Sequence, residues 1–269
     1  MDDDDVHVRG VTSVSDELFV LLERDDDFND DDDDDDVNQV AVYSITDYQL
    51  RRHLSVPGYS PGVHSDMTSC VRHKCLYMSD HGDSCIHRYV LASGAIGKWS
   101  VPGKPLSLSV TPRGNLLVTY QCKLVELSAE SGQCVRVIAV QTAIVFPWHS
   151  VQLTTGQYVV CHGVYNSGLQ RVCVVGDDGK VTRSYGGQSG SEVGQLHQPY
   201  HMAVDEDSQS IFVADSGNDR VVLLSPTLEF ARYVTEGLSS LYFSRLYFHQ
   251  ATRRLFVSKG DDAITVVQL

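Results

Sequence analysis

The sequence lacks an apolar run long enough to cross a bilayer, a stretch with a sustained 3.6-residue apolar period, and a Cys-x-x-Cys pair. The first absence excludes a membrane-spanning helix, so no membrane partner is expected. The second disfavours helical bundles, and the third makes a structural zinc knuckle unexpected. A basic leader is also missing, because Met1 is followed by four aspartates. Without a secretory signal, the cytoplasm is the expected compartment.

The number of cysteines and the distribution of charged residues further limit which classes of protein are expected. The seven cysteines are odd in number, and in the cytoplasm most are expected to be reduced core residues. The net charge of −14 is local, because residues 1–36 hold 17 of the 35 acidic residues and two of the 21 basic ones. Residues 24–37, RDDDFNDDDDDDDV, are predicted to form a low-complexity acidic insertion. The rest of the chain is nearly neutral, which leaves a nucleic-acid-binding face open.

The chain does contain an internal repeat. Ser-Val-Pro-Gly occurs at 55–58 and again at 100–103, which is 45 residues further on. Residues 199–226 match residues 64–91 when shifted by 135 residues, and PYHMAV at 199–204 matches PWHSVQ at 147–152. Copies of the same shape begin near residues 11, 105 and 243. A regular repeat of this length is typical of solenoids and propellers.

Each copy consists of short apolar segments separated by turn residues, which predicts antiparallel strands. Six copies of about four strands predict an all-β fold, a six-bladed β-propeller in one domain spanning 1–269. Ser-Val-Pro-Gly then ends an outer strand and turns the chain toward the next blade. The last blade is expected to be incomplete, and only VHVRG at 6–10 could supply its outer strand. The expected blades are 6–58, 64–103, 104–141, 142–195, 196–238 and 239–269.

Residues 185–226 resemble an NHL repeat, the unit of a family of six-bladed propellers. The resemblance covers roughly forty residues as sequence, and the other copies are degenerate; in the second blade Cys85 stands where Arg220 stands in the fifth. The matching residues are Gly186, Gly187, Gly190, Gly194, Gln195, Leu196, Pro199, Ala203, Val204, Asp205, Val213, Ala214, Asp215, Ser216, Asn218, Arg220 and Val221.

The resemblance implies an interaction module. NHL propellers occur most often as C-terminal interaction modules. In the tripartite-motif NHL proteins they follow a RING, a B-box and a coiled coil, and they bind proteins or RNA. This chain has neither a RING ladder of cysteine and histidine nor a heptad run, so a ubiquitin-ligase activity would have to lie outside it. A minority of related six-bladed propellers are metal-dependent enzymes, including an amidating lyase with zinc in the channel.

The repeated turn residues are predicted to serve folding. Asp215 and Asn218 should satisfy backbone N–H groups of the turn, while Arg220 pairs with an acid. Asp80 and Asp83 should act in the same way in the second blade.

The first residues of each inner strand are the candidate binding residues, because they lie at one mouth of the central channel. Five polar residues from five blades could converge there, with Val11 as a weak candidate in the first blade. Two equivalent aromatic residues flank the histidines and could anchor a peptide, stack on a base or pack in the core. The predicted ligand-binding residues are Asp66, Ser107, His149, Trp148, His201, Tyr200 and Arg245.

Three functions remain open on these residues. Protein or peptide binding without catalysis or a cofactor is the first prediction. Single-stranded RNA binding is the second, with phosphate contacts from Arg245 and from basic clusters at 51–52, 72–74, 232 and 253–254. The third is a metal-dependent lyase or hydrolase, because Asp66, His149 and His201 have zinc-ligand chemistry and a Ser-His-Asp triad could be drawn from the same set.

Overall fold

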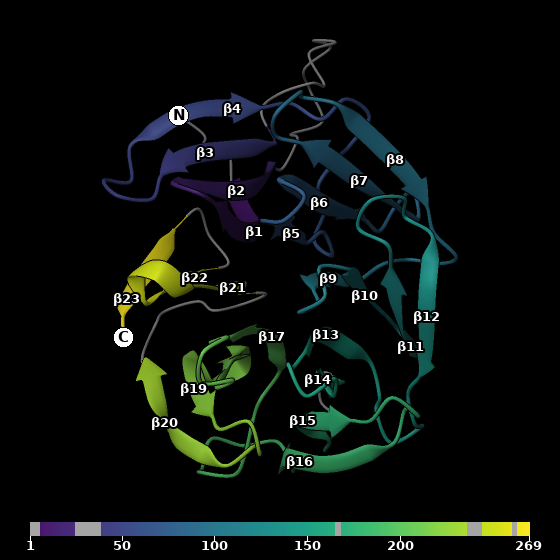
Figure 1. Cartoon of the computed structure of the whole chain (residues 1–269). Helices are drawn as coiled ribbons and strands as arrows, with labels where there is room; N and C mark the ends of the chain where they lie inside the picture. The colour runs from purple at the N-terminus through teal and green to yellow at the C-terminus, as the bar shows by residue number, and fades with distance from the viewer. Residues whose placement is uncertain (1–5, 25–38, 165–167, 236–243, 260–262) are drawn as a thin grey trace, which may run out of the picture.

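A computed structural model of the chain describes residues 6–24, 39–164, 168–235, 244–259 and 263–269. These residues form six antiparallel sheets arranged as blades around a common axis, as Figure 1 shows. Within the described ranges the only helical segments are two 3-10 turns, η1 (Ser216–Asn218) and η2 (Gln250–Thr252). The predicted six-bladed β-propeller is confirmed. The predicted acidic insertion falls mainly on 25–38, outside the described residues.

The strands follow the predicted blades in order along the chain. Blade 1 holds β1 (Val6–Val14), β2 (Glu17–Arg24), β3 (Val40–Ser44) and β4 (Leu50–Leu54), and blade 2 holds β5 (Met67–Cys70), β6 (Cys75–Asp80), β7 (Cys85–Val90) and β8 (Ile96–Ser100). Blade 3 holds β9 (Ser107–Val110), β10 (Leu116–Tyr120), β11 (Lys123–Leu127) and β12 (Cys134–Ala139), and blade 4 holds β13 (Pro147–Gln152), β14 (Tyr158–Gly163), β15 (Gln170–Val175) and β16 (Val181–Gly187). Blade 5 holds β17 (Pro199–Val204), β18 (Ile211–Asp215), β19 (Arg220–Leu224) and β20 (Phe230–Thr235), and blade 6 holds β21 (Leu246–His249), β22 (Arg254–Ser258) and β23 (Ile264–Gln268).

The core lies between neighbouring blades. The second strand of each blade is short, rich in β-branched and aromatic residues, and buried on both faces, as all five residues of β18 are. Met202 of blade 5, for example, packs in one cluster with Val159 and Val172 of blade 4. The outer strands are mostly exposed or partly buried, as β4 and β8 are. Burial is therefore greatest in the second strands, as in β6 and β10, and lowest in the outer strands at the rim.

The Ser-Val-Pro-Gly motif has the role predicted for it. The proline and glycine of each copy follow an outer strand, β4 or β8. Gly58 has φ +70° and Gly103 has φ +123°, a region that favours glycine. Each motif turns the chain from the rim of one blade toward the inner strand of the next.

The predicted closure of blade 6 by residues 6–10 is wrong. These residues belong to β1 and pair with β2, so that Val8 lies opposite Leu22. Blade 6 has three strands within the described part of the chain. It joins blade 1 through its face instead: Phe256 packs in the cluster of blade-1 side chains, and the Tyr247 and Ser13 hydroxyls lie 2.6 Å apart.

Candidate functional site

The inner strands place one residue from each blade at the same level of the axis. β-Bulges precede three of these positions, between Val8 and Gly10, between Pro147 and His149, and between Pro199 and His201. The bulged residues are Arg9, Trp148 and Tyr200, which confirms that Trp148 and Tyr200 are equivalent. By register, the six equivalent positions are Gly10, Asp66, Ser107, His149, His201 and Arg245. Five of the six were predicted; Gly10, rather than Val11, completes the set.

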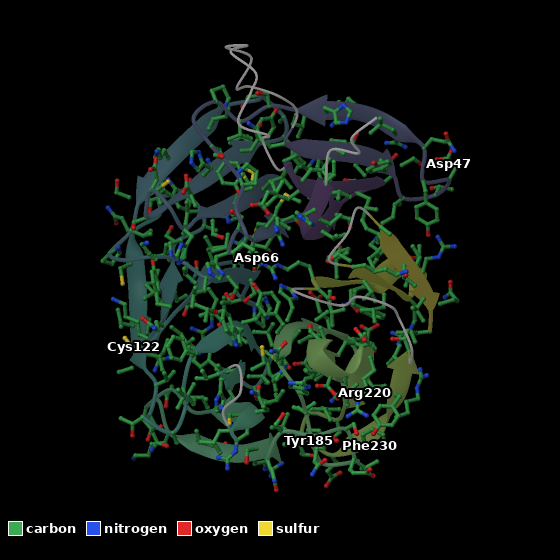
Figure 2. The ribbon with its side chains drawn as sticks, turned by 180° about the vertical axis from the view of Figure 1, so that it is seen from behind. Asp47, Asp66, Cys122, Tyr185, Arg220 and Phe230 are labelled. Carbon is green, nitrogen blue, oxygen red and sulfur yellow. The ribbon has the colours of Figure 1, made fainter. Side chains whose placement is uncertain are left out.

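Asp66 contacts residues of several other blades at this level. Figure 2 shows it at the centre of the ring, and its side chain is almost fully buried. Its Oδ1 accepts the N–H of Met67 at 3.0 Å, and its Oδ2 accepts the N–H of Leu108 at 2.8 Å. Oδ1 also lies 3.6 Å from Nε2 of His201 and 3.4 Å from Nε of Arg245. One carboxylate thus links blades 2, 3, 5 and 6.

Arg245 extends the same network to blade 1. Its side chain is 2% exposed. Its Nε donates to the carbonyl of Arg9 at 3.1 Å, and Nη2 donates to the carbonyl of Ser65 at 2.7 Å. The guanidinium lies 4.6 Å from the centre of the Tyr200 ring, a cation–π contact. The cation of Arg245 therefore balances the charge of Asp66 inside the protein.

The titration of the site follows from burial and this pairing. Burial opposes the ionisation of Asp66, but its interactions with His201 and Arg245 outweigh burial and lower its pKa. Burial lowers the pKa of His201, and lowers that of His149 well below its usual value. The site at neutral pH therefore holds one carboxylate, one guanidinium and two neutral imidazoles.

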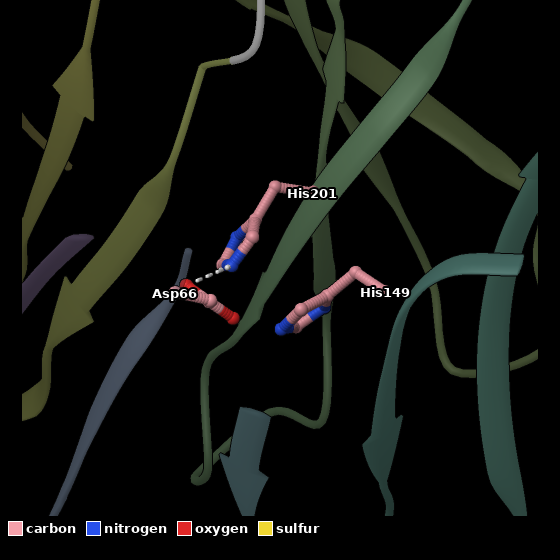
Figure 3. A group of neighbouring side chains, drawn as sticks. All are labelled: Asp66, His149 and His201. Carbon is pink, nitrogen blue, oxygen red and sulfur yellow. Dashed lines mark ion pairs between the residues drawn. The ribbon is translucent and has the colours of Figure 1, made fainter. Parts of the chain in front are cut away.

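The side chains at the axis are of the types that bind zinc, but the hydrogen bonds of His201 do not suit a metal ligand. Figure 3 shows the rings of His149 and His201 directed toward Asp66, and one donor atom from each lies within 4.8 Å of the others. However, Nδ1 of His201 accepts the N–H of Leu246 at 3.2 Å. A neutral imidazole has one donor and one acceptor nitrogen, so this bond assigns the proton of His201 to Nε2, which faces Asp66. A metal ion there would have to displace that proton and would also face the cation of Arg245.

Ser107 is buried at the same level but is not part of a triad. Its Oγ makes no hydrogen bond within the described residues. The nucleophile-to-base contact that a Ser-His-Asp site requires is therefore not formed.

Three partly buried rings and one buried ring contact one another next to this level, and we call them the mouth aromatic cluster: His64, His81, Trp148 and Tyr200. The Trp148 and Tyr200 rings are 5.3 Å apart, and His64 stacks on Trp148 at 6.2 Å. His81 follows at 4.8 Å from His64. Nε1 of Trp148 donates to the carbonyl of Gly163 at 2.8 Å, which fixes its ring.

Sequence reasoning missed His64 and His81. Both lie outside the strands, in the loop before Asp66 and in the turn after β6. The one available signal was their position next to the repeated inner-strand entry and the repeated turn.

The predicted phosphate-binding clusters are largely engaged with the protein itself. Arg51 pairs with Asp16 at 2.9 Å, Arg52 pairs with Glu17, and Arg253 pairs with Asp205 at 2.9 Å. Of the remaining basic residues, Arg72 donates to a carbonyl and Arg254 to the hydroxyl of Tyr48.

The predicted structural role of the repeated turn residues holds for Asp215, Arg220 and Asp80, but Asn218 donates to Asp215 and to the Gly190 carbonyl instead of accepting a backbone N–H, and the side chain of Asp83 pairs with Lys98. Oδ1 of Asp215 accepts the N–H of His197 at 2.6 Å, and Oδ2 accepts from Arg220 Nε at 2.7 Å and from Asn218 at 2.8 Å. In blade 2, Asp80 accepts the N–H of Asp83 at 2.8 Å.

A cavity of about 390 Å³ lies elsewhere, at turns of blades 3 and 4. Its lining includes Arg113, Glu126, Arg136 and Asp177, and none of the predicted site residues. Among the described residues, no helix has the length and apolar character needed to span a bilayer.

Comparison with known proteins identifies the fold. No protein-family model and no curated protein matches the chain. Among solved structures, hydrazine synthase of Kuenenia stuttgartiensis is similar over 100% of this chain and 97% of its own, with TM-score 0.66 and 12% identity. A catalytically inactive virginiamycin B lyase from Staphylococcus aureus, solved with quinupristin, is similar over 100% and 86%, with TM-score 0.63 and 10% identity. A streptogramin B lyase gives TM-score 0.64 at 10% identity, over 100% of this chain and 85% of its own. Sequence identities this low support the propeller fold alone.

Proposed function

We propose that this chain is a non-catalytic, NHL-like propeller that binds a peptide segment of another protein at the mouth aromatic cluster. The observation that supports it best is the row of ring contacts from His81 through His64 and Trp148 to Tyr200. The NHL-like residues of blade 5 support the same class of module.

Peptide binding suits the composition of this surface. Tryptophan and tyrosine are over-represented among residues that dominate protein–protein binding energy, because they bury a large rigid area and keep one polar group. Phe146 and Val63, the neighbours of this cluster in the chain, are each 39% exposed. The surface therefore offers apolar contact area beside partly exposed imidazoles.

RNA binding is less well supported. Aromatic rings can stack on bases, but affinity for single strands also needs free cations along the backbone. Arg245 is buried against Asp66, and Arg51, Arg52 and Arg253 are in ion pairs with acids. Phosphates would have to compete with these carboxylates.

A displayed library of random peptides selected on the immobilised full chain tests the proposal. Recovered peptides are labelled, and their affinity is measured by fluorescence anisotropy for the wild type, Trp148→Leu and Trp99→Leu. The chain has two tryptophans, and Trp99, partly buried on the outer strand β8, is the matched control. We expect the Kd to rise at least about tenfold in Trp148→Leu, the effect of losing one dominant aromatic contact, and to stay unchanged in Trp99→Leu.

The same variants decide between the alternatives. Peptides that bind Trp148→Leu as tightly as the wild type would contradict the proposed surface. A different outcome is that no peptide is recovered and that the chain binds a degenerate single-stranded RNA pool saturably, with an affinity that rises as the salt concentration falls. That outcome would replace the proposal with RNA recognition. Circular dichroism of each variant shows that the fold is retained.

A further inference from the structure

Blades 2 and 5 build similar turns, and one of the differences between them is the partner of the buried carboxylate. In blade 5, Asp215 pairs across the sheet with Arg220, and its Oδ2 lies 2.7 Å from Nε of that arginine. In blade 2, the register places Asp80 opposite Cys85. Blade 2 therefore keeps the buried carboxylate and lacks the guanidinium that neutralises it in blade 5.

His87 lies where it can join this pair. Its Nε2 is 3.4 Å from Oδ2 of Asp80 and 3.4 Å from Sγ of Cys85. Cys85 and His87 are each 1% exposed, and Asp80 is 7% exposed. The three donor atoms lie within 4.8 Å of one another. Neither a thiol nor a neutral imidazole carries the permanent positive charge of a guanidinium.

We propose that Asp80, Cys85 and His87 form a zinc site, in which the ion takes the place of the Arg220 guanidinium of blade 5. Thiolate, imidazole and carboxylate are the ligands that zinc prefers in proteins. A tetrahedral ion with ordinary bond lengths separates such ligand atoms by about 3.3–3.6 Å. The two separations from Nε2 of His87 have this value, and the third, between Asp80 and Cys85, is no more than 4.8 Å.

The hydrogen bonds around the cluster permit metal binding. Nδ1 of His87 has no hydrogen-bond partner within the described residues, so it can hold the ring proton and leave the lone pair of Nε2 for zinc. His201 at the axis differs, because the N–H of Leu246 occupies its Nδ1. Asp80 also has an outer contact, since its Oδ1 accepts the N–H of Asp83.

Binding releases one proton to solvent. The Cys85 thiol loses its proton as the sulfur–zinc bond forms, while Asp80 and neutral His87 bind without a net proton change. Water fills the fourth position of the tetrahedron. No oxidation or reduction is involved.

Cobalt titration tests the site directly. The full chain is prepared with Cys122→Ser and Cys134→Ser, because these two cysteines are exposed and could bind metal adventitiously. We expect one cobalt ion per chain to produce a thiolate-to-cobalt charge-transfer band and intense visible bands of tetrahedral cobalt, which zinc then displaces. The bands should disappear in Cys85→Ser.

Cys173→Ser is the matched control. Cys173 is also buried, and its Sγ lies 3.3 Å from Nε2 of His162. No carboxylate completes this pair among the described residues, so the bands should survive the substitution. Absence of the bands in the parent protein, their survival in Cys85→Ser or their loss in folded Cys173→Ser would overturn the proposal.

Cys85→Arg provides a second test, which compares the effect of zinc on the thermal stability of this variant and of the parent protein. This substitution restores the arginine of blade 5, so the variant should fold without metal. Zinc should raise the Tm of the parent protein and leave that of Cys85→Arg unchanged. An equal zinc-dependent rise in both proteins would place the metal elsewhere and overturn the proposal.

Discussion

At the scale of single residues, burial decides which form the histidines adopt. His162 on β14 is fully buried; its Nδ1 accepts the N–H of Val145 at 3.4 Å, and its Nε2 lies 3.3 Å from Sγ of Cys173. Burial, with a smaller contribution from Arg171, lowers the pKa of His162 to about 4. The folded protein thus holds this imidazole neutral where an unfolded chain would begin to protonate it.

The consequence is a loss of stability in mild acid. As the pH falls below about 6.5, the unfolded state binds a proton at His162 before the folded state does, so the free energy of unfolding decreases until the pH nears 4. From pH 7 to pH 5 this one group should cost about 2 kcal/mol. Urea unfolding at the two pH values measures the total change, to which the buried His149 and His201 also contribute.

His162→Gln isolates that contribution. The variant should lose less stability than the wild type between pH 7 and pH 5, by about 2 kcal/mol. His53→Gln, on the exposed strand β4, is the control and should behave as the wild type. An unchanged pH dependence in folded His162→Gln would show that this imidazole is not held neutral by burial.

At the scale of strands, the inner strand of blade 1 depends on a glycine beside its bulge. A Cβ on Gly10 would lie 2.6 Å from Cβ of Met67 and 2.9 Å from its backbone nitrogen. Met67 follows Asp66 on the neighbouring blade, so a side chain at Gly10 would push blades 1 and 2 apart. We expect Gly10→Ala to destabilise the protein by about 1–3 kcal/mol.

Gly187→Ala is the matched control for this expectation. Gly187 is also in a strand, β16, but a Cβ there would meet nothing within 4 Å. Its substitution should change the free energy of unfolding by no more than about 0.5 kcal/mol. Chemical denaturation of the three proteins gives the comparison, and equal stabilities of Gly10→Ala and the wild type would refute the packing argument.

The repeat explains why much of the fold was predictable. A strand has a side-chain period of two, so aligning His201 with Asp66 and His149 fixed which residues face the axis. The contacts between blades were not predictable in the same way. Spacing along one strand does not say that Arg245 of blade 6 reaches Asp66 of blade 2, because that distance depends on how the blades are tilted and bulged. The cluster of Asp80, Cys85 and His87 lies within blade 2 instead, where the pairing of β6 with β7 and the two-residue spacing of Cys85 and His87 place these side chains together.

At the scale of the molecule, the three-stranded blade 6 raises the question of what closes the ring. Asp66 of blade 2 contacts Leu108 of blade 3, His201 of blade 5 and Arg245 of blade 6, and Arg245 also donates to the carbonyl of Arg9 in blade 1. This buried ion pair lies between the last blade and the second, across the junction of the chain's two ends. We infer that ring closure depends on it.

A double-mutant cycle on Asp66 and Arg245 tests this account. Asp66→Asn leaves a buried guanidinium without its counter-ion, and Arg245→Met leaves a buried carboxylate, so each should cost about 3–5 kcal/mol. The double variant removes both charges and should be about as stable as either single variant, or more stable. The exposed pair Arg51–Asp16 is the control, and Arg51→Ala should cost less than about 1 kcal/mol.

The coupling energy between Asp66 and Arg245 shows whether this ion pair, or the packing of apolar side chains alone, holds blade 6 against blade 1. If the pair closes the ring, each single variant should also unfold with a smaller dependence on denaturant, because blade 6 separates before the remaining blades unfold. The double variant should recover the wild-type dependence. Strictly additive losses with an unchanged denaturant dependence would instead mean that the packing of Phe256 against blade 1 closes the ring. In that case Phe256→Ala, rather than either charged variant, would release blade 6.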